Sequence, residues 1–202
     1  MIKKQNVLKS AALALFASAF VVACSKNEDA AKLTFNEPVA AVSPVITSDT
    51  IYGNFGNPAS GPAVYGAVYL NLTTNPIGVS TTLDSSHDVK LYLTNNSFVA
   101  GVNGYRVKFL QNTGLASIAS LNLSSFNTRP FVDSVGRSTT TPPNGWYTYT
   151  PPNAALDTVP GFYIAAISST EQAYAIKFRY VGGDGGATSN RGKYIIQYGR
   201  LF

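Results

Sequence analysis

The sequence has very few of the residues that carry catalysis, with one cysteine, Cys24, and one histidine, His87, among 202 residues. A single cysteine excludes a disulfide within the chain. Ser86 and Asp88 flank the histidine, but neighbouring strand residues point to opposite faces and do not converge into a triad. Nucleophile-elbow, zinc-protease, phosphate-loop and EF-hand patterns are absent. We therefore predict a protein that is not an enzyme and that binds no metal ion.

Charge is also scarce, at 12% of residues, and the formal net charge is +5. Three lysines of that balance lie in the first nine residues, with no acidic residue among them. The other Lys and Arg residues are scattered along the chain, whereas a nucleic-acid footprint is a cluster of basic residues. We expect no nucleic-acid partner.

The N-terminus has the layout of a bacterial export signal. The basic first nine residues precede an apolar stretch, Ala11–Val22, which is too short to span a bilayer. Val21-Val22-Ala23-Cys24 ends this stretch and resembles the lipobox of bacterial lipoproteins, with Val21 where leucine is usual. An ordinary secretory signal is the alternative. We predict cleavage before Cys24 and lipidation of its thiol and amine, because two or three acyl chains give stable membrane anchoring.

The predicted organisation is a signal peptide at 1–23, a lipidated N-terminus and tether at 24–48, and one domain at 49–202. Cleavage leaves 179 residues, which suffice for a single hydrophobic core. Ser25-Lys26-Asn27-Glu28-Asp29 resembles the short acidic export signal of Bacteroidota lipoproteins, which implies an outer-membrane address at the cell surface.

Composition and periodicity predict an all-β domain, an antiparallel sandwich or partly closed barrel. Aromatic residues, Thr and Val are abundant, and Gly, Pro and Asn punctuate the runs between them. Apolar and polar residues alternate in several runs, as in a sheet with one buried face. Gly182–Gly186 is predicted to be a flexible hairpin loop. Residues 111–145 form an insert that is functional, is disordered or hides a strand near Leu115–Leu123. The predicted strands are Val64–Leu72, His87–Leu93, Tyr105–Phe109, Trp146–Tyr149, Phe162–Ile167, Tyr174–Tyr180 and Tyr194–Tyr198.

The C-terminal half carries a family resemblance. Trp146-Tyr147-Thr148-Tyr149 is followed by Gly161-Phe162-Tyr163-Ile164, then by Ala173-Tyr174-Ala175-Ile176-Lys177-Phe178-Arg179-Tyr180 and a closing aromatic strand, Lys193–Tyr198. This series resembles the HmuY family, haem-binding surface lipoproteins of Bacteroidota with an all-β fold. Tyr69-Leu70-Asn71-Leu72 and His87-Asp88-Val89-Lys90-Leu91 are similar in outline to its N-terminal half, so the resemblance covers roughly residues 60–202.

The resemblance implies haem as the cofactor and a TonB-dependent outer-membrane transporter as the partner. Haem iron takes axial ligands from His, Met, Cys or Tyr. Residues 106–145 contain none of these, and the sequence has one histidine, so a bis-His pair is excluded. His87 or a tyrosine would supply a single ligand. The alternative for His87 is a packing role, because alternation places it on the same face as the core-side Val89 and Leu91. A structural or adhesive lipoprotein without a small ligand and a small outer-membrane β-barrel are the competing hypotheses.

Overall fold

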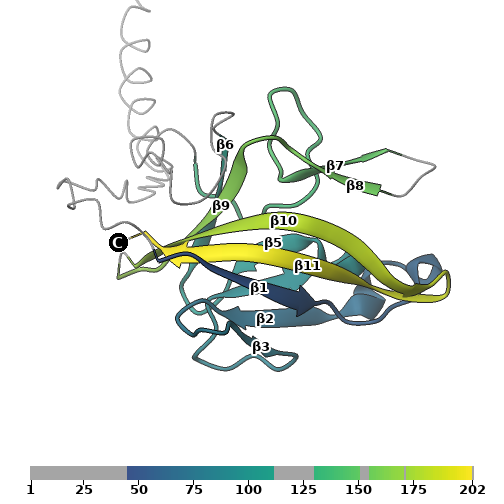
Figure 1. The fold of residues 1–202 in the computed structure, drawn as a ribbon, viewed down its shortest axis with the longest axis horizontal. Coiled ribbons are helices and arrows are strands. Elements are labelled where there is room, and N and C mark those ends of the chain that lie inside the picture. The colour runs from purple at the N-terminus through teal and green to yellow at the C-terminus, as the bar shows by residue number, and fades with distance from the viewer. Residues whose placement is uncertain (1–44, 112–129, 151–154, 171, 202) are drawn as a thin grey trace, which may run out of the picture. The chain divides into compact units, whose positions relative to one another are not determined.

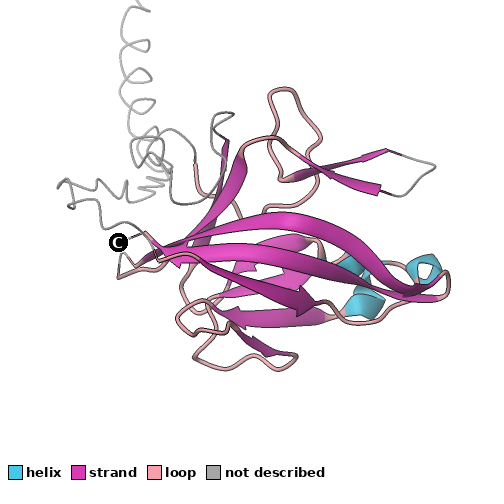
Figure 2. Ribbon diagram, in the orientation of Figure 1, coloured by secondary structure: helices cyan, strands magenta, loops and turns pink. Residues whose placement is uncertain are grey.

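The computed structural model describes residues 45–111, 130–150, 155–170 and 172–201. All of them belong to one compact unit, Glu37–Phe202. Nearly all regular structure in the described part is antiparallel β-sheet, as Figure 2 shows, with three short 3₁₀ helices: η1 (Pro58–Ser60), η2 (Pro62–Tyr65) and η3 (Thr94–Asn96). None of the helices among these residues is long and apolar enough to cross a membrane.

The larger sheet has the strand order β1-β11-β10-β9-β6, and every neighbouring pair is antiparallel. Its centre is a long curved hairpin of β10 and β11 that runs across the molecule (Figure 1). Register aligns Ile176 of β10 with Tyr198 of β11 and Ile164 of β9, so their apolar side chains share one face. The strands are β1 (Thr47–Tyr52), β6 (Arg106–Gln111), β9 (Phe162–Ile167), β10 (Ala173–Gly186) and β11 (Ser189–Arg200).

The second sheet has four strands in the order β3-β2-β4-β5. It packs against the first, since Val68, Leu70 and Leu91 join Ile176 and Ile196 in one buried cluster. A separate two-stranded sheet pairs β7 with β8. The described strands thus form open sheets in a sandwich rather than a closed barrel, which confirms the predicted all-β sandwich class. The strands are β2 (Ala67–Asn71), β3 (Gly78–Ser80), β4 (Val89–Tyr92), β5 (Phe98–Gly101), β7 (Tyr147–Thr150) and β8 (Ala155–Thr158).

Trp146 lies at the centre of the core. It is fully buried, and its ring centroid lies 4.5 Å from that of Phe178 and 5.8 Å from that of Phe162. Its indole N–H donates to the backbone oxygen of Ser97 at 2.8 Å, which satisfies the one polar atom of the side chain. Trp146 therefore packs against β9 and β10 through its ring and is joined by its N–H to the loop that precedes β5.

The strands depart from the sequence prediction at their ends. Phe162–Ile167 coincides with β9, whereas β10 and β11 extend well beyond the predicted runs. The prediction of a flexible loop at Gly182–Gly186 is wrong, because these residues continue β10 in register with β11. The ladder is reinforced there by an Asp184–Arg191 ion pair at 2.8 Å. Backbone pairing thus holds a glycine-rich strand segment whose sequence has no apolar alternation that would indicate a strand.

The remaining differences involve short or polar segments. Val64–Leu72 divides between η2 and β2, and β4 begins at Val89, after His87. The strands β1, β3, β5 and β8 were not predicted. β1 begins at Thr47, two residues inside the predicted tether, and its polar sequence offers little apolar alternation. The possible strand at Leu115–Leu123 lies outside the described residues.

Candidate functional site

A groove of about 430 Å³ lies at the end of the sandwich where β1 and β10 begin and where β2 and β11 end. We call it the terminal groove. Its volume falls within the range of small-molecule sites. Four segments that are far apart in the sequence form its walls. The lining residues are Val45, Thr47, Leu72, Thr73, Thr74, Asn75, Gln172, Tyr174, Tyr198, Gly199 and Arg200.

The floor of the groove is apolar and its rim is polar. Leu72, Tyr174 and Tyr198 are each at most 5% exposed. By contrast, Asn75, Gln172 and other rim residues are exposed. The groove thus combines a few buried apolar and aromatic side chains with exposed polar ones.

The two floor tyrosines stay protonated. Burial raises the pKa of Tyr174, and the charge of Asp88 raises it further, while Arg200 opposes the shift. Burial also raises the pKa of Tyr198, with a further contribution from Asp49. The hydroxyl of Tyr198 donates to the backbone oxygen of Thr74 at 2.8 Å. The floor thus presents neutral phenols at neutral pH.

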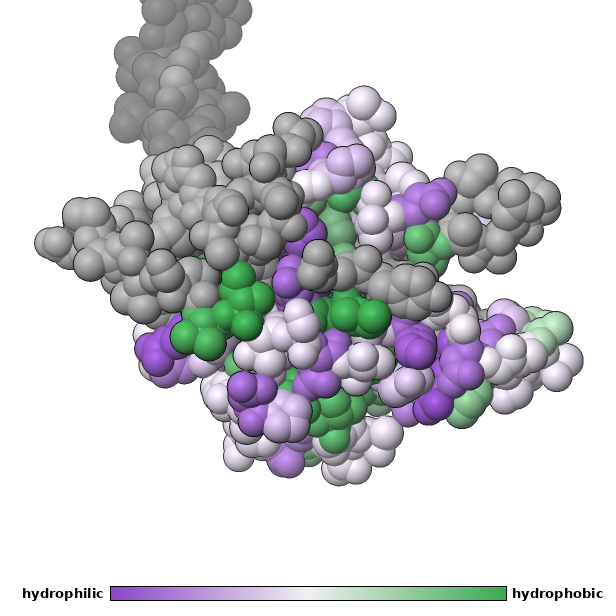
Figure 3. All heavy atoms as spheres, viewed as in Figure 1, coloured by the Kyte–Doolittle hydropathy of each residue, from purple (hydrophilic) through white to green (hydrophobic). Residues whose placement is uncertain are grey.

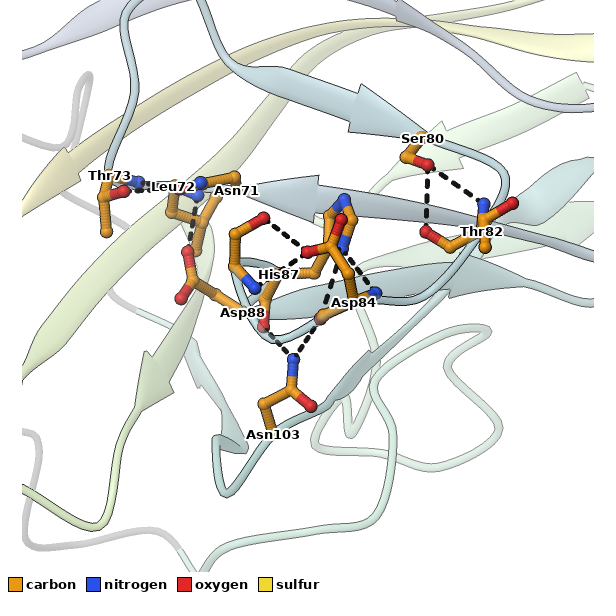
Figure 4. Close-up of polar contacts among 10 residues, drawn as sticks. Asn71, Leu72, Thr73, Ser80, Thr82, Asp84, His87, Asp88 and Asn103 are labelled. Carbon is orange, nitrogen blue, oxygen red and sulfur yellow. Dashed lines mark hydrogen bonds and ion pairs between the residues drawn. The ribbon is translucent and has the colours of Figure 1, made fainter.

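One wall of the groove is the β2–β3 loop, and polar contacts fix its shape. The backbone N–H of Leu72 donates to Asp88 Oδ2 at 2.6 Å. The backbone N–H and hydroxyl of Thr73 both donate to Asn71 Oδ1, as Figure 4 shows. The N–H of Ile77 donates to Asp49 Oδ2 at 2.9 Å, which ties the far side of the loop to β1. These contacts pre-form the wall without a ligand.

Asp88 lies behind this wall and is 5% exposed. Burial raises the pKa of its carboxyl, and the hydrogen bonds from Leu72 and Tyr105 act in the opposite direction. Burial also raises the pKa of Tyr105, with further contributions from Asp88. The ring of Tyr105 lies 6.3 Å from that of Tyr174. Asp88 thus holds one wall of the groove, and Tyr105 lies beside the floor residue Tyr174.

His87 precedes β4 and is 4% exposed. Its Nδ1 accepts a hydrogen bond from the backbone N–H of Asp84 at 3.1 Å and lies 3.1 Å from Asp84 Oδ1. The amide of Asn103 donates to the backbone oxygens of Asp84 and His87, which closes the loop (Figure 4). The ring also packs at 5.8 Å from Tyr69. The Asp84 backbone and carboxylate thus hold the Nδ1 edge of the ring.

The site residues predicted from the sequence, Cys24 and His87, stay predictions. His87 is not among the residues that line the terminal groove, whereas Tyr174 and Tyr198 lie in its floor. Cys24 and residues 112–129 of the predicted insert lie outside the described residues. The end of that insert is described, and Val132 and Val135 form isolated bridges with Val107 and Val99. Nothing in the sequence singles out the groove, because its lining comes from separate segments.

A second, smaller cavity of about 190 Å³ lies beside β6, lined by Gly101, Tyr105, Arg106, Phe131, Val132 and Asp133. The guanidinium of Arg106 and the ammonium of Lys108 each lie 4.3 Å from the centroid of the Phe131 ring. Within the described residues, no group of three or more His, Cys, Asp or Glu side chains is placed to hold a metal ion. No protein-family model matches the sequence, and a search of curated proteins finds no match.

Proposed function

We propose that this chain is an envelope lipoprotein, anchored in the outer membrane through lipid on Cys24, whose all-β domain binds a ligand at the cell surface. The observation that carries the anchor is Val21-Val22-Ala23-Cys24, directly after a basic and then an apolar segment. The terminal groove supports the binding role. In this proposal the domain acts by binding a ligand.

Haem is the ligand that the HmuY resemblance suggests, with delivery to a TonB-dependent transporter. The geometry makes an iron bond from His87 costly, because the side chain is 4% exposed and its ring packs against Tyr69. The floor tyrosines bind iron only as phenolates, and burial raises the pKa of both. We therefore propose the terminal groove, rather than the His87 loop, as the ligand site. Haem that binds in the groove would find neither His87 nor the floor tyrosines ready to coordinate its iron.

An adhesive or structural lipoprotein is the other candidate. On the face shown in Figure 3, apolar residues form separate patches among polar ones, without one continuous apolar surface. Broad apolar patches mark many protein–protein contacts. That face therefore gives no support to an adhesive role, whereas the groove supports ligand binding.

Two measurements test the proposal. Cells that express the full chain are labelled with palmitate, and the label is expected on the protein and absent from Cys24→Ala, which also keeps its signal peptide. Ser25→Ala is the matched control and should be labelled. Unlabelled wild-type protein would disprove the anchor.

Haemin titration of the mature lipoprotein in lipid nanodiscs tests the ligand. A Soret band that shifts at one equivalent and is lost in His87→Ala would overturn the placement at the groove. A shift that survives both His87→Ala and Tyr174→Phe is the result expected for haem that enters the groove without either side chain as an iron ligand. Empty nanodiscs correct for haemin that partitions into lipid.

A further inference from the structure

The smaller cavity beside β6, which we call the β6 cavity, is lined by one side chain of each charge. Arg106 is its one cation and Asp133 its one acid, and both residues are exposed. Within the part of the chain that the structure describes, neither side chain forms a hydrogen bond or an ion pair, with each other or with another residue. A guanidinium and a carboxylate that line one cavity without pairing are each available to the opposite charge of one ligand.

The aromatic ring of Phe131 positions the guanidinium of Arg106 at the cavity. The guanidinium carbon lies 4.3 Å from the centroid of this ring, which is within the range of a cation–π contact. The N–H donors of a guanidinium lie in its own plane, so contact with a ring leaves donors at its edge for a ligand. Lys108 approaches the same ring, but it is 6% exposed and does not line the cavity. Arg106 is therefore the cation that an entering ligand meets.

Backbone hydrogen bonds fix the two walls that carry these charges. The N–H of Val132 donates to the backbone oxygen of Val107 at 3.0 Å, so the segment with the acid is held beside β6. The N–H of Tyr105 donates to the backbone oxygen of Val102 at 2.9 Å and closes the turn that leads into β6. Since the walls are formed without a ligand, binding has a lower cost in ordering them.

The size of the β6 cavity limits its occupant. Its volume of about 190 Å³ lies below the range of about 300–1,000 Å³ that is typical for drug-sized ligands. Val132 is 40% exposed and adds an apolar surface beside the two charges. A matching ligand is therefore small, carries both a carboxylate and an ammonium group, and has a short apolar side chain.

From this arrangement we propose that the β6 cavity binds small zwitterions with the chemistry of a free α-amino acid that has a short apolar side chain. The carboxylate of the ligand pairs with the guanidinium of Arg106, its ammonium group pairs with Asp133, and its side chain packs on Val132. The β6 cavity shares no lining residue with the terminal groove, and it is a second site that does not depend on the ligand proposed there.

Three probes of similar size separate the two charges. L-Valine carries both, L-valinamide carries only the ammonium group, and isovalerate carries only the carboxylate. Each is titrated into the mature lipoprotein in phosphatidylcholine nanodiscs and followed by ligand-observed NMR, which detects weak binding, with empty nanodiscs subtracted. We expect valine to bind about fivefold more tightly than either analogue, because each exposed ion pair adds a modest gain in affinity.

Two substitutions should each remove the contribution of one charge. Arg106→Gln should lower the affinity for valine about fivefold and leave the affinity for valinamide unchanged. Asp133→Asn should lower the affinity for valine by a similar factor and leave the affinity for isovalerate unchanged. Arg137→Gln and Asp157→Asn are the matched controls, because both residues are exposed and neither lines the cavity. They should change none of the three affinities.

Equal affinity of the wild type for valine and its two analogues would overturn the zwitterion proposal. So would an affinity for valine that survives either Arg106→Gln or Asp133→Asn, because both charges are required to contact the ligand. Absence of valine binding to the wild type would overturn the β6 cavity as a site and leave the terminal groove unaffected. Emission from the buried Trp146 checks that each variant is folded.

Discussion

The carboxylate of Asp88 accepts a hydrogen bond from the backbone N–H of Leu72 at 2.6 Å, across 16 residues of chain. This contact joins the start of β4 to the end of β2, and Leu72 is both its donor and part of the groove floor. A buried N–H that loses its acceptor costs free energy because it is left unsatisfied. The shape of the groove therefore depends on an acid that does not line it.

Replacing Asp88 tests this dependence. We expect Asp88→Ala to lower the free energy of unfolding by about 1–3 kcal/mol, because a buried donor loses its partner. Asp88→Asn keeps an acceptor oxygen and should lose less. Urea denaturation followed by Trp146 fluorescence measures both. Asp157→Ala, an exposed acid on β8, is the control, and an equal loss there would contradict the role of Asp88.

The pH dependence of stability gives a second test at the same residue. Burial raises the pKa of Asp88 above its ordinary value of 3.8. The folded state therefore holds the proton longer than the unfolded state, and stability from this group falls as pH rises through the folded pKa. We expect wild-type protein to lose stability relative to Asp88→Asn as pH rises above about 4. A difference between the two that stays constant with pH would refute the shift.

Buried tyrosines should make the fold less stable at alkaline pH. Burial raises the pKa of Tyr194, whose hydroxyl also donates to the backbone oxygen of Asn95, above the ordinary value of 10.0. The unfolded state loses its proton first, so stability falls as pH rises above about 10. Absorbance of tyrosinate at alkaline pH should then appear together with loss of the β-sheet circular dichroism signal.

Tyr194→Phe should flatten that alkaline loss of stability, even though it also removes a hydrogen bond. Tyr52→Phe serves as the comparison, because Tyr52 is 38% exposed on the outer side of β1. If both variants change the alkaline slope equally, burial of Tyr194 is not the cause.

At the tip of the β10–β11 hairpin we expect a substitution to change local amide exchange more than global stability. The guanidinium of Arg191 pairs with Asp184 and lies 4.4 Å from the Tyr52 ring and 4.5 Å from the Phe55 ring. These groups are partly exposed, so we expect Arg191→Ala to lower global stability by less than about 1 kcal/mol. Amide exchange in Gly182–Gly186 should nevertheless accelerate, because few other side chains hold that ladder. Unchanged exchange in these glycines, measured by mass spectrometry, would contradict the inference.

We expect the largest single loss of stability on replacement of Trp146. Trp146→Ala removes a fully buried ring and leaves the backbone oxygen of Ser97 without its donor. We expect a loss of about 3–5 kcal/mol, measured by circular dichroism because the fluorescent reporter is removed. Val64→Ala, at an exposed site, should cost little by comparison. A small loss at Trp146 would show that the core can collapse around the cavity.

Local pattern predicted the β class and the core strands, because alternation over several residues is a property of the chain itself. Phe162–Ile167 is the clearest case, since an unbroken apolar run between turn signals coincides with β9. The same reasoning failed at Gly182–Gly186. Glycines carry no apolar alternation, and their strand conformation depends on the partner strand opposite them.

The terminal groove could not be predicted in the same way. Tyr174 and Tyr198 appear in the sequence as core-facing aromatics, and nothing local shows that their rings also form the floor of a groove. Leu72 and Arg200 meet them only because β2 and β11 end at the same edge of the sandwich. The sequence makes His87 a candidate ligand because it is the single histidine, whereas in the structure its ring is turned inward against Tyr69.

The sequence by itself determined the all-β class, the predicted anchor at Cys24 and the scarcity of catalytic groups, because each depends on residue type or on short-range order. Only the tertiary structure decided which side chains meet. The Asp88–Leu72 contact, the buried ring of His87 and the Arg106–Phe131 contact all join residues distant in sequence. Such contacts depend on strand register and sheet packing, which short-range patterns do not encode.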